Sequence, residues 1–403
     1  MNERRLVVLL PAVLLALLVC GCANRSTLPP DQNDPSQAAL RDSSGSSGNG
    51  YAVIHSFADD PDGAYPKVER LATVNGKLYG TTQYGGLYNK GTVFEAQPGG
   101  TERVIHSFGK DAADGQQPVA GLLNVDGTLY GTTLEGGTQS LGTLFKITSS
   151  GQEHVIHSFG SGNDGTFPKA APVLYDNVIY GTTSSAARAG GTVFTMTRNG
   201  HYHVLHFFGL HDGTAPVAAL VVVGKTLFGT TQSGGKHSAG TVFSITPEGR
   251  ERVVYSFSAG ADGAAPSGSL VQVGKLLYGT TNTKGAYGVG TAFDMPLNGP
   301  VKTLHAFGHS YDAGSPVGGL SYVHGWLYGT GSVGGSYSFG ALYAIDTRGH
   351  ERLVHSFTAP DDGARPLGTV ILYGSKLYGT TWVGGTVHTS IGGYGTVYTL
   401  NPL

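Results

Sequence analysis

The chain has 403 residues, of which 65 are glycine, and 39% of its residues are hydrophobic. Glycine is well above its average use of about 7%, but the apolar fraction is large enough for a folded core, so a mostly disordered chain is excluded. Charged residues make up 13%, with 25 Lys and Arg against 27 Asp and Glu, for a net charge of −2. This balance argues against the basic surface of a nucleic-acid-binding protein, so no DNA or RNA partner is expected.

The kinds of residue that accompany the glycines indicate the fold class. The glycines follow no Gly-X-Y period and occur with 21 Tyr, 16 Phe and many Val and Thr. Aromatic and β-branched residues favour pleated strands, and glycine favours the tight turns between them. The composition therefore predicts an all-β protein.

The amino terminus has the features of an export signal. Two arginines precede an apolar run at residues 6–19, which is too short for a stable membrane anchor but long enough for a signal-peptide core. The V-C-G-C segment that follows resembles a bacterial lipobox, with Cys22 as the lipidated residue. An ordinary secretory signal, cut near Gly21 or Ala23, is the alternative.

The lipobox interpretation divides the first fifty residues. Residues 1–21 are predicted to be the lipoprotein signal peptide, and residues 22–50 the lipidated cysteine with a flexible tether, because this stretch is polar and rich in Pro and Gly. Acyl chains on Cys22 would hold the protein on a membrane without a spanning helix. By resemblance to lipoprotein sorting rules, Ala23 favours the outer membrane, so we expect a bacterial envelope protein facing the periplasm or the cell surface.

From residue 51 onward, the chain repeats itself seven times. Segments like L-Y-G-T-T recur at separations of 51, 50, 48, 50, 50 and 50 residues, and segments like G-T-V-F and V-I-H-S-F recur in step with them. Every copy also has an aspartate four residues before a proline. These aspartates are Asp62, Asp114, Asp164, Asp212, Asp262, Asp312 and Asp362.

Each repeat is expected to form four short antiparallel strands, which we name A to D in chain order. The fourth copy shows them as A-A-L-V-V-V, T-L-F-G-T-T, G-T-V-F-S-I-T and R-E-R-V-V-Y-S-F. Gly-Lys or Asp-Gly pairs between strands A and B, and Pro-Glu-Gly between C and D, are typical of tight hairpins. Four strands at this period predict a β-propeller blade, with a parallel β-solenoid as the alternative.

The two ends of the repeat region predict how the ring closes. The region begins at Tyr51 with a D-type strand and ends with a C-type strand. The first strand can therefore complete the last blade, which leaves no sheet edge open. We predict that residues 51–403 form one seven-bladed β-propeller closed by the amino-terminal strand.

The repeat motif resembles a known family. The motif V-I-H-S-F, D-G-A-Y-P, G-K-L-Y-G-T-T-Q-Y-G-G and K-G-T-V-F is similar to the GloVer tandem repeat of bacterial exported proteins, over residues 51–403. Kelch and WD repeats fit less well, because the chain has only Trp326 and Trp382 and no Trp-Asp pair. The resemblance implies an exported or envelope protein with a propeller-like body, and it supplies no catalytic residues.

The repeated polar residues are interpreted as structural. Histidine occupies one position of strand D in six copies, with Tyr255 in the remaining copy. With one histidine per blade, these side chains cannot converge on a single ion. We therefore expect local hydrogen bonds to the Thr pair of strand B, and we expect no metal site and no cofactor. The repeated aspartates are expected to cap turns through backbone N–H groups, since one Asp per loop falls short of the six or more oxygens that calcium needs. The histidines are His55, His106, His157, His206, His305 and His355.

Residues that break the repeat are the candidates for recognition. The D–A and B–C connections of a four-stranded blade open on the same face, so that face is the expected working surface. The last B–C loop runs 17 residues from Tyr378 to Gly395, against 12 in the first copy, and extra loop length often marks function. The ligand-binding candidates are Tyr84, Tyr88, Tyr287, Tyr337, Trp382, His388 and Tyr394, and further nonrepeated residues of this face are Glu135, His211, His237, His309 and Tyr311.

A binding or scaffold function fits these residues better than catalysis. Tyrosine and tryptophan on a face of low charge suit stacking on sugar rings or docking of an envelope protein. The chain has no G-x-S-x-G, H-E-x-x-H or Gly-rich phosphate motif, so no catalytic residue is assigned. The alternative is a propeller hydrolase or lyase that acts on an extracellular polysaccharide, with Glu135 and scattered histidines as its only support.

Overall fold

The computed structural model describes residues 49–403 except residues 68, 188, 310 and 387–391. The chain divides into two units, Met1–Ser46 and Ser47–Leu403, and the second is described below. The predicted signal peptide, the lipidated Cys22 and nearly all of the tether lie outside the described residues. Within the described part, no helix is long and apolar enough to cross a membrane.

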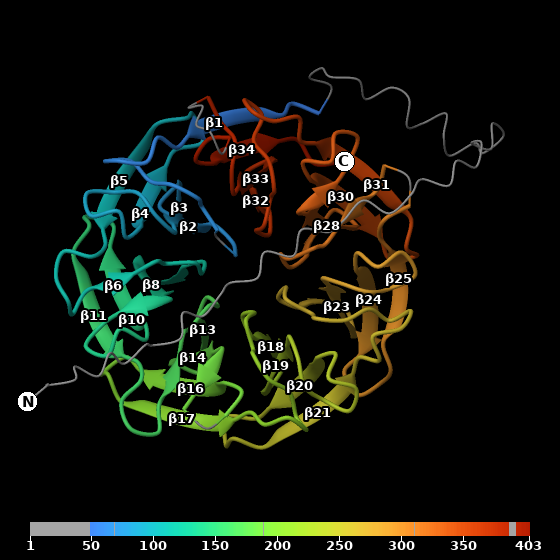
Figure 1. Cartoon of the computed structure of the whole chain (residues 1–403), viewed down its shortest axis with the longest axis horizontal. Coiled ribbons are helices and arrows are strands. Elements are labelled where there is room, and N and C mark those ends of the chain that lie inside the picture. The colour runs from blue at the N-terminus through green and yellow to red at the C-terminus, as the bar shows by residue number, and fades with distance from the viewer. Residues whose placement is uncertain (1–48, 68, 188, 310, 387–391) are drawn as a thin grey trace, which may run out of the picture. The chain divides into compact units, whose positions relative to one another are not determined.

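Seven four-stranded antiparallel sheets surround a central axis, which confirms the predicted β-propeller (Figure 1). In every blade strand A is innermost and strand D outermost. The first blade consists of β2 (Ala72–Val74), β3 (Lys77–Thr82), β4 (Thr92–Ala96) and β5 (Glu102–Ser107). The second and third consist of β7 (Leu123–Val125), β8 (Thr128–Thr133), β10 (Thr143–Thr148) and β11 (Glu153–Ser158), and of β13 (Val173–Tyr175), β14 (Val178–Thr183), β16 (Thr192–Thr197) and β17 (Tyr202–Phe207).

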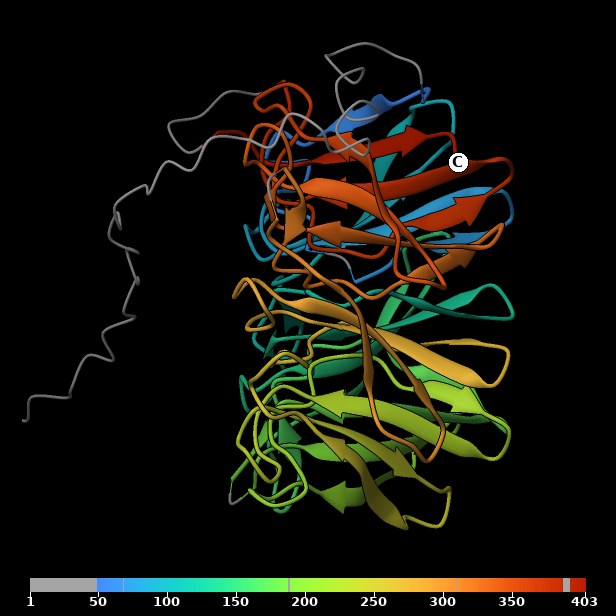
Figure 2. The same cartoon turned by 90° about the vertical axis from the view of Figure 1, so that its right-hand side faces the viewer.

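The remaining blades repeat the same order of strands. The fourth and fifth consist of β18 (Val221–Val223), β19 (Thr226–Thr231), β20 (Thr241–Ile245) and β21 (Glu251–Ser256), and of β22 (Val271–Val273), β23 (Leu276–Thr281), β24 (Thr291–Pro296) and β25 (Lys302–Ala306). The sixth consists of β27 (Ser321–Val323), β28 (Trp326–Gly331), β30 (Ala341–Asp346) and β31 (Glu351–Ser356). Figure 2 shows the irregular loops gathered on one side of the ring and the hairpin turns on the other.

The seventh blade is closed by the amino-terminal strand, as predicted. It combines β32 (Ile371–Tyr373), β33 (Lys376–Thr381) and β34 (Thr396–Leu400) with β1 (Ala52–Ser56). Strand β1 pairs antiparallel with β34, with Ala52 opposite Thr399 and Ser56 opposite Thr396. The two ends of the domain therefore share one sheet.

Aromatic pairs connect each blade to the next. The phenylalanine after each D strand contacts the aromatic residue of the following C strand, with ring centroids 4.7 to 5.3 Å apart. Inclined pairs of this kind add about 0.5–1.5 kcal/mol each beyond the burial of their surface. The pairs are Phe57–Phe94, Phe108–Phe145, Phe159–Phe194, Phe208–Phe243, Phe257–Phe293, Phe307–Tyr343 and Phe357–Tyr398.

The glycine of the L-Y-G-T-T segment makes room for these rings. In the second blade, a Cβ on Gly131 would lie 2.5 Å from Cζ of Phe145 on the adjacent strand. Real Cβ atoms do not approach a ring carbon this closely, so only glycine fits without a shift of the aromatic ring. The glycine of each L-Y-G-T-T segment therefore leaves the space that the aromatic ring of the G-T-V-F segment fills.

Five of the six D-strand histidines bond to aspartates, so the expected bonds to the threonines of strand B were wrong. His55 Nε2 lies 3.0 Å from Asp62 Oδ2, and the corresponding distances in the copies led by His157, His206, His305 and His355 are 2.6 to 3.0 Å. The threonines bond elsewhere, as Thr82 Oγ1 does to Thr92 Oγ1 at 2.8 Å. The aspartates also accept backbone N–H groups, for example Asp62 Oδ2 from Ala58 at 3.0 Å.

Candidate functional site

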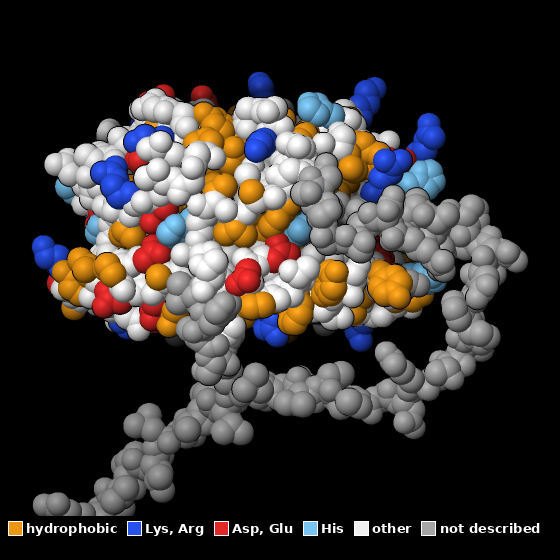
Figure 3. Space-filling model, turned by 90° about the horizontal axis from the view of Figure 1, so that it is seen from above, with side chains coloured by type: hydrophobic (Ala, Val, Ile, Leu, Met, Phe, Trp, Pro, Cys, Tyr) orange, Lys and Arg blue, Asp and Glu red, His pale blue; other side chains and the backbone are white. Residues whose placement is uncertain are grey.

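The D–A and B–C loops of each blade lie together on one face, which we call the loop face. Short pairings join them, such as the bridges Ala64–Tyr84 and Thr214–Ser233. In three blades the pairing forms two-residue strands, namely β6 (Gly115–Gln116) with β9 (Glu135–Gly136), β12 (Gly165–Thr166) with β15 (Ser185–Ala186), and β26 (Ala313–Gly314) with β29 (Val333–Gly334). Seen edge-on in Figure 3, hydrophobic side chains lie in small groups among polar ones rather than in one large patch.

Three of the predicted candidates, Tyr84, Trp382 and Tyr394, meet around Tyr65, which the sequence analysis did not name. The ring centroid of Tyr65 lies 6.0 Å from that of Tyr84, 5.8 Å from that of Trp382 and 5.8 Å from that of Tyr394. The backbone N–H of Tyr65 also donates to the carbonyl of Tyr394 at 2.7 Å. We call these four residues the aromatic cluster; it lies where the seventh blade meets the first.

The backbone conformation at Tyr65 recurs in every blade. Tyr65 has a φ of 58° and precedes a proline, and its carbonyl accepts the backbone N–H of Gln83 at 3.1 Å. A left-handed non-glycine residue costs free energy, and such residues concentrate at functional sites. The backbone conformation is the same in every blade, but the side chain at this position differs. These positions therefore make the loop face chemically different from one blade to the next. The residues at these positions are Tyr65, Gln117, Phe167, Ala215, Ala265, Ser315 and Arg365.

Planar polar groups border the aromatic cluster. The Arg365 guanidinium carbon lies 6.0 Å from the centre of the Trp382 ring, as in a cation–π contact. On the other side, Gln117 Oε1 accepts the Tyr84 hydroxyl at 3.4 Å, and Gln117 Nε2 donates to Glu135 Oε2 at 2.8 Å. The cluster therefore combines half-buried rings with amide, carboxylate and guanidinium groups.

Three other candidates do not join the aromatic cluster. Tyr88, Tyr287 and Tyr337 are exposed on the B–C loops of the first, fifth and sixth blades, and the Tyr287 ring packs against His309 at 5.7 Å between centroids. His388 lies outside the described residues. The six candidates that the structure describes thus divide into three that meet at the aromatic cluster and three that lie apart from it.

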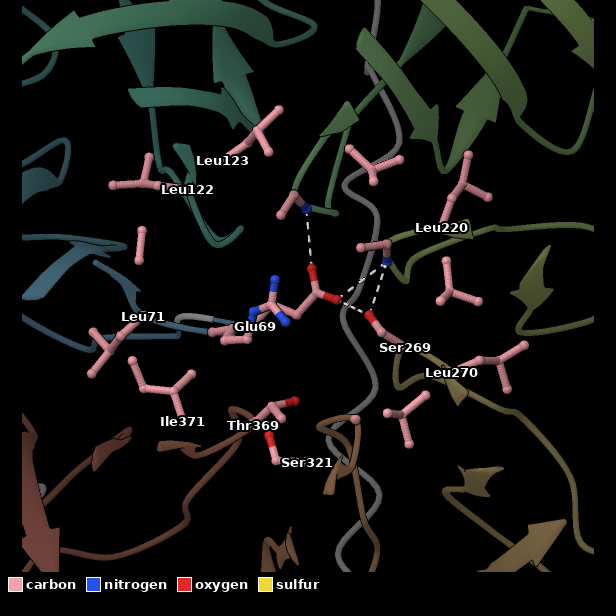
Figure 4. A pocket seen from close by; sticks show the side chains of 18 of the residues that line it. Glu69, Leu71, Leu122, Leu123, Leu220, Ser269, Leu270, Ser321, Thr369 and Ile371 are labelled. Carbon is pink, nitrogen blue, oxygen red and sulfur yellow. Dashed lines mark hydrogen bonds between the residues drawn. The ribbon is translucent and has the colours of Figure 1, made fainter. Parts of the chain in front are cut away.

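A second feature, the central channel, lies inside the ring of A strands. It contains a cavity of about 840 Å³ whose walls combine polar residues with apolar ones, to which Leu71, Leu122, Leu220 and Leu270 belong (Figure 4). Each of these leucines precedes or begins the innermost strand of its blade. The channel is therefore lined by the inner edges of the blades, with apolar and polar side chains side by side.

Glu69 reaches into this channel from the first blade. Its carboxylate accepts the backbone N–H of Ala171 at 3.0 Å and of Ala219 at 3.2 Å, together with the hydroxyl of Ser269 (Figure 4). Its own carbonyl accepts the backbone N–H of Thr369 at 2.6 Å. One residue thus bonds to four other blades across the axis.

Sequence reasoning missed Glu69, although a signal for it was present. Asp62 and Tyr79 are 17 positions apart, whereas 16 separate the corresponding aspartate and aromatic residue in each other copy. The first repeat therefore has one extra residue between Pro66 and Leu71. That insertion is what brings a glutamate to the channel.

Comparison with known proteins identifies the family. A model of the Gloeobacter/Verrucomicrobia repeat matches residues 43–190 and 176–398. Among solved structures, the chain is similar to the computationally designed Ika8 protein, with 13% identity, a TM-score of 0.49 and coverage of 87% of this chain and 99% of that chain.

Two natural proteins give similar values. A putative 6-phosphogluconolactonase from Bacteroides uniformis is 15% identical, with a TM-score of 0.47 over 71% of this chain and 84% of that chain, and a puromycin hydrolase is 11% identical, with a TM-score of 0.50 over 77% of this chain and 49% of that chain. At these identities the likeness concerns the fold alone. A search of curated proteins gives no significant match. Because the two matches together cover residues 43–398, which are most of the chain, the chain belongs to the Gloeobacter/Verrucomicrobia repeat family.

Proposed function

We propose that this protein is an envelope-anchored, non-catalytic binding protein that recognises a glycan through the aromatic cluster of its loop face. The observation that carries the proposal is the convergence of Tyr65, Tyr84, Trp382 and Tyr394 from three separate loop segments. Blade packing alone does not require this grouping, because the other blades have small or polar residues at the position of Tyr65 in all but one case.

The chemistry of the cluster suits a sugar better than a charged ligand. A pyranose ring offers an apolar C–H face that stacks on Tyr or Trp, and hydroxyl groups that bond to planar amides and carboxylates. Gln117 and Glu135 supply such groups beside Tyr84. Among the described residues, the buried Trp382 Nε1 has no hydrogen-bond partner, which leaves a donor next to the rings.

The anchor is the second part of the proposal. Lipidation of Cys22, followed by the polar tether, would place the propeller in the envelope, attached to a membrane yet free to reach a polysaccharide or a protein. Replacing Cys22 with Ser should move the protein from the membrane fraction to a soluble exported pool. An unchanged membrane fraction would contradict the lipid anchor without bearing on the loop face.

Glycan binding can be tested on an array of bacterial and plant polysaccharides, followed by calorimetry on the best ligand. Trp382→Ala and Tyr65→Ala should each weaken binding about tenfold or more, which corresponds to ~1.4 kcal/mol. Tyr337→Ala is the matched control, because this exposed tyrosine lies outside the cluster, and it should leave the affinity unchanged.

Three results would contradict this proposal. The first is the absence of binding to any glycan, combined with capture of a defined envelope protein that the cluster variants still bind. The second is an equal loss of affinity in the Tyr337 control. The third is release of sugar products that disappears in Glu135→Gln, which would favour the alternative of a polysaccharide hydrolase or lyase.

A further inference from the structure

Four of the D-strand histidines face a glutamate of the next blade as well as their own loop aspartate. Each histidine comes from the outer strand of one blade, the aspartate from the loop that follows, and the glutamate from the start of the next outer strand. The four trios are His55–Asp62–Glu102, His106–Asp114–Glu153, His206–Asp212–Glu251 and His305–Asp312–Glu351.

The ligand-type atoms of each trio converge. In every trio, one nitrogen or oxygen from each residue lies within 4.8 Å of the other two. In the first, His55 Nε2 is 3.0 Å from Asp62 Oδ2 and 3.7 Å from Glu102 Oε2. A tetrahedral ion with bonds of about 2.0–2.2 Å keeps its ligand atoms about 3.3–3.6 Å apart, so small side-chain movements would bring these atoms onto one ion.

Each trio also holds a buried carboxylate oxygen without a partner. The Oε1 atoms of Glu102, Glu153, Glu251 and Glu351 are all buried and accept no hydrogen bond. The Glu102 side chain is only 7% exposed. A buried oxygen of this kind is costly unless a proton or a cation satisfies it.

The three remaining blade interfaces provide an internal comparison. Tyr202 and Tyr51 replace the glutamate at two of them and stack flat on His157 and His355, with ring centroids 3.9 and 3.8 Å apart. At the last one, Tyr255 replaces the histidine and a valine replaces the glutamate. The glutamate therefore occurs only where a histidine faces it, which indicates that the two act together.

One trio lines a cavity through which an ion could reach it. His106, Asp114 and Glu153 line a cavity of about 610 Å³ at the outer side of the first and second blades. His106 Nε2 has no hydrogen-bond partner and lies 3.9 Å from Asp114 Oδ1. An imidazole nitrogen with two carboxylates suits zinc and its neighbours, while three side chains fall short of the coordination that calcium requires.

We propose that the four His–Asp–Glu trios bind divalent transition-metal ions of the zinc class, one at each of four interfaces between neighbouring blades. The dication would balance the two carboxylates, fill the vacant coordination of the glutamate Oε1 atoms and join successive blades. No metal was expected from the sequence, because one histidine per blade cannot meet the histidines of the other blades. Their partners here come from the adjoining loop and the next repeat.

The test is zinc binding by the full chain after removal of metal with a chelator. Calorimetry in a non-coordinating buffer at about pH 7.5 and metal analysis after gel filtration should both give four zinc ions per chain. Glu102→Gln should reduce the number by one, and replacing all four glutamates with Gln should remove all four ions. Zinc should also raise the melting temperature of the wild type and not of the fourfold variant.

A variant that gains a zinc ion provides a second test, because misfolding can remove a binding site but cannot create one. Tyr202→Glu recreates the trio with His157 and Asp164 and should raise the number of zinc ions from four to five, while Tyr202→Phe should leave it at four. The proposal is overturned if zinc does not bind, or if the number of ions is the same after the Glu→Gln changes, which would assign binding to exposed histidines. A third outcome would also overturn it: zinc does not bind, and the Glu→Gln variants are more stable than the wild type. That result would mean that the aspartate and glutamate of each trio share a proton instead of a metal ion.

Discussion

The carboxylate of Glu69 in the first blade accepts a hydrogen bond from the backbone N–H of Ala219 in the fourth blade, 150 positions away along the chain. Ala171 and Ala219 lie just before the innermost strands of their blades, so their N–H groups take no part in strand pairing. A carboxylate placed among them satisfies two N–H groups and the hydroxyl of Ser269 at once. An inserted residue in one blade thereby connects blades that share no sheet edge.

Glu69→Ala should lower the thermal stability of the ring. It leaves the N–H group of Ala171 without its acceptor and that of Ala219 with only the Ser269 hydroxyl, and an unsatisfied buried donor costs about 1–3 kcal/mol. The melting temperature, followed by circular dichroism, should fall accordingly. Sodium acetate should restore part of the loss in this variant, because a free carboxylate can occupy the vacated position, whereas sodium chloride at equal ionic strength should not. If the variant melts like the wild type, Glu69 does not link the blades.

Deleting residues 51–57 should destabilise the whole domain. The deletion removes β1, so β34 loses its antiparallel partner and the seventh blade exposes an unpaired edge. Because each blade is supported by its neighbours, a single early unfolding transition is expected rather than two separate ones. Deleting residues 24–46, which belong to the other unit of the chain, is the control and should leave the transition in place. Equal melting of the two deletion variants would refute closure by β1.

Gly131→Ala should destabilise the interface between the first two blades. The added methyl would meet the Phe145 ring, and overpacking of a core costs about 1–3 kcal/mol. Combining it with Phe145→Leu should recover part of the stability, since the smaller side chain relieves the contact. Gly99→Ala is the control, because nothing lies within 4 Å of a Cβ there. Equal denaturant midpoints for the two single variants would show that the glycine is not needed for packing.

The features that recur in every repeat could be predicted from the sequence, whereas the contacts between different blades could not. Strand order, blade number and closure follow from counting copies, because each blade is a local unit of hairpins. Contacts such as Glu69 with Ala219, or His55 with Glu102, connect residues whose proximity depends on how the blades are placed around the axis. The loop-face candidates show both cases: Trp382 and Tyr84 break the repeat and meet, whereas Tyr287 breaks the repeat and lies apart. Their common neighbour Tyr65 was overlooked because it occupies a position present in every copy.

Acid should remove the stabilisation that Glu95 provides. Burial alone would raise the pKa of this carboxyl, but hydrogen bonds from Lys77 at 2.6 Å, Tyr79 at 2.9 Å and Arg103 at 3.2 Å favour its charged form and hold its pKa below the ordinary 4.5. A carboxyl whose pKa is lower in the folded than in the unfolded state stabilises the fold above the unfolded value and loses that effect as the pH falls through the folded value. The free energy of unfolding, measured by denaturant titration, should therefore be higher for the wild type than for Glu95→Gln at neutral pH. The difference should shrink steadily below a pH of about 4.5. A difference that stays constant down to acid unfolding would mean that Glu95 acts through packing and not through its charge.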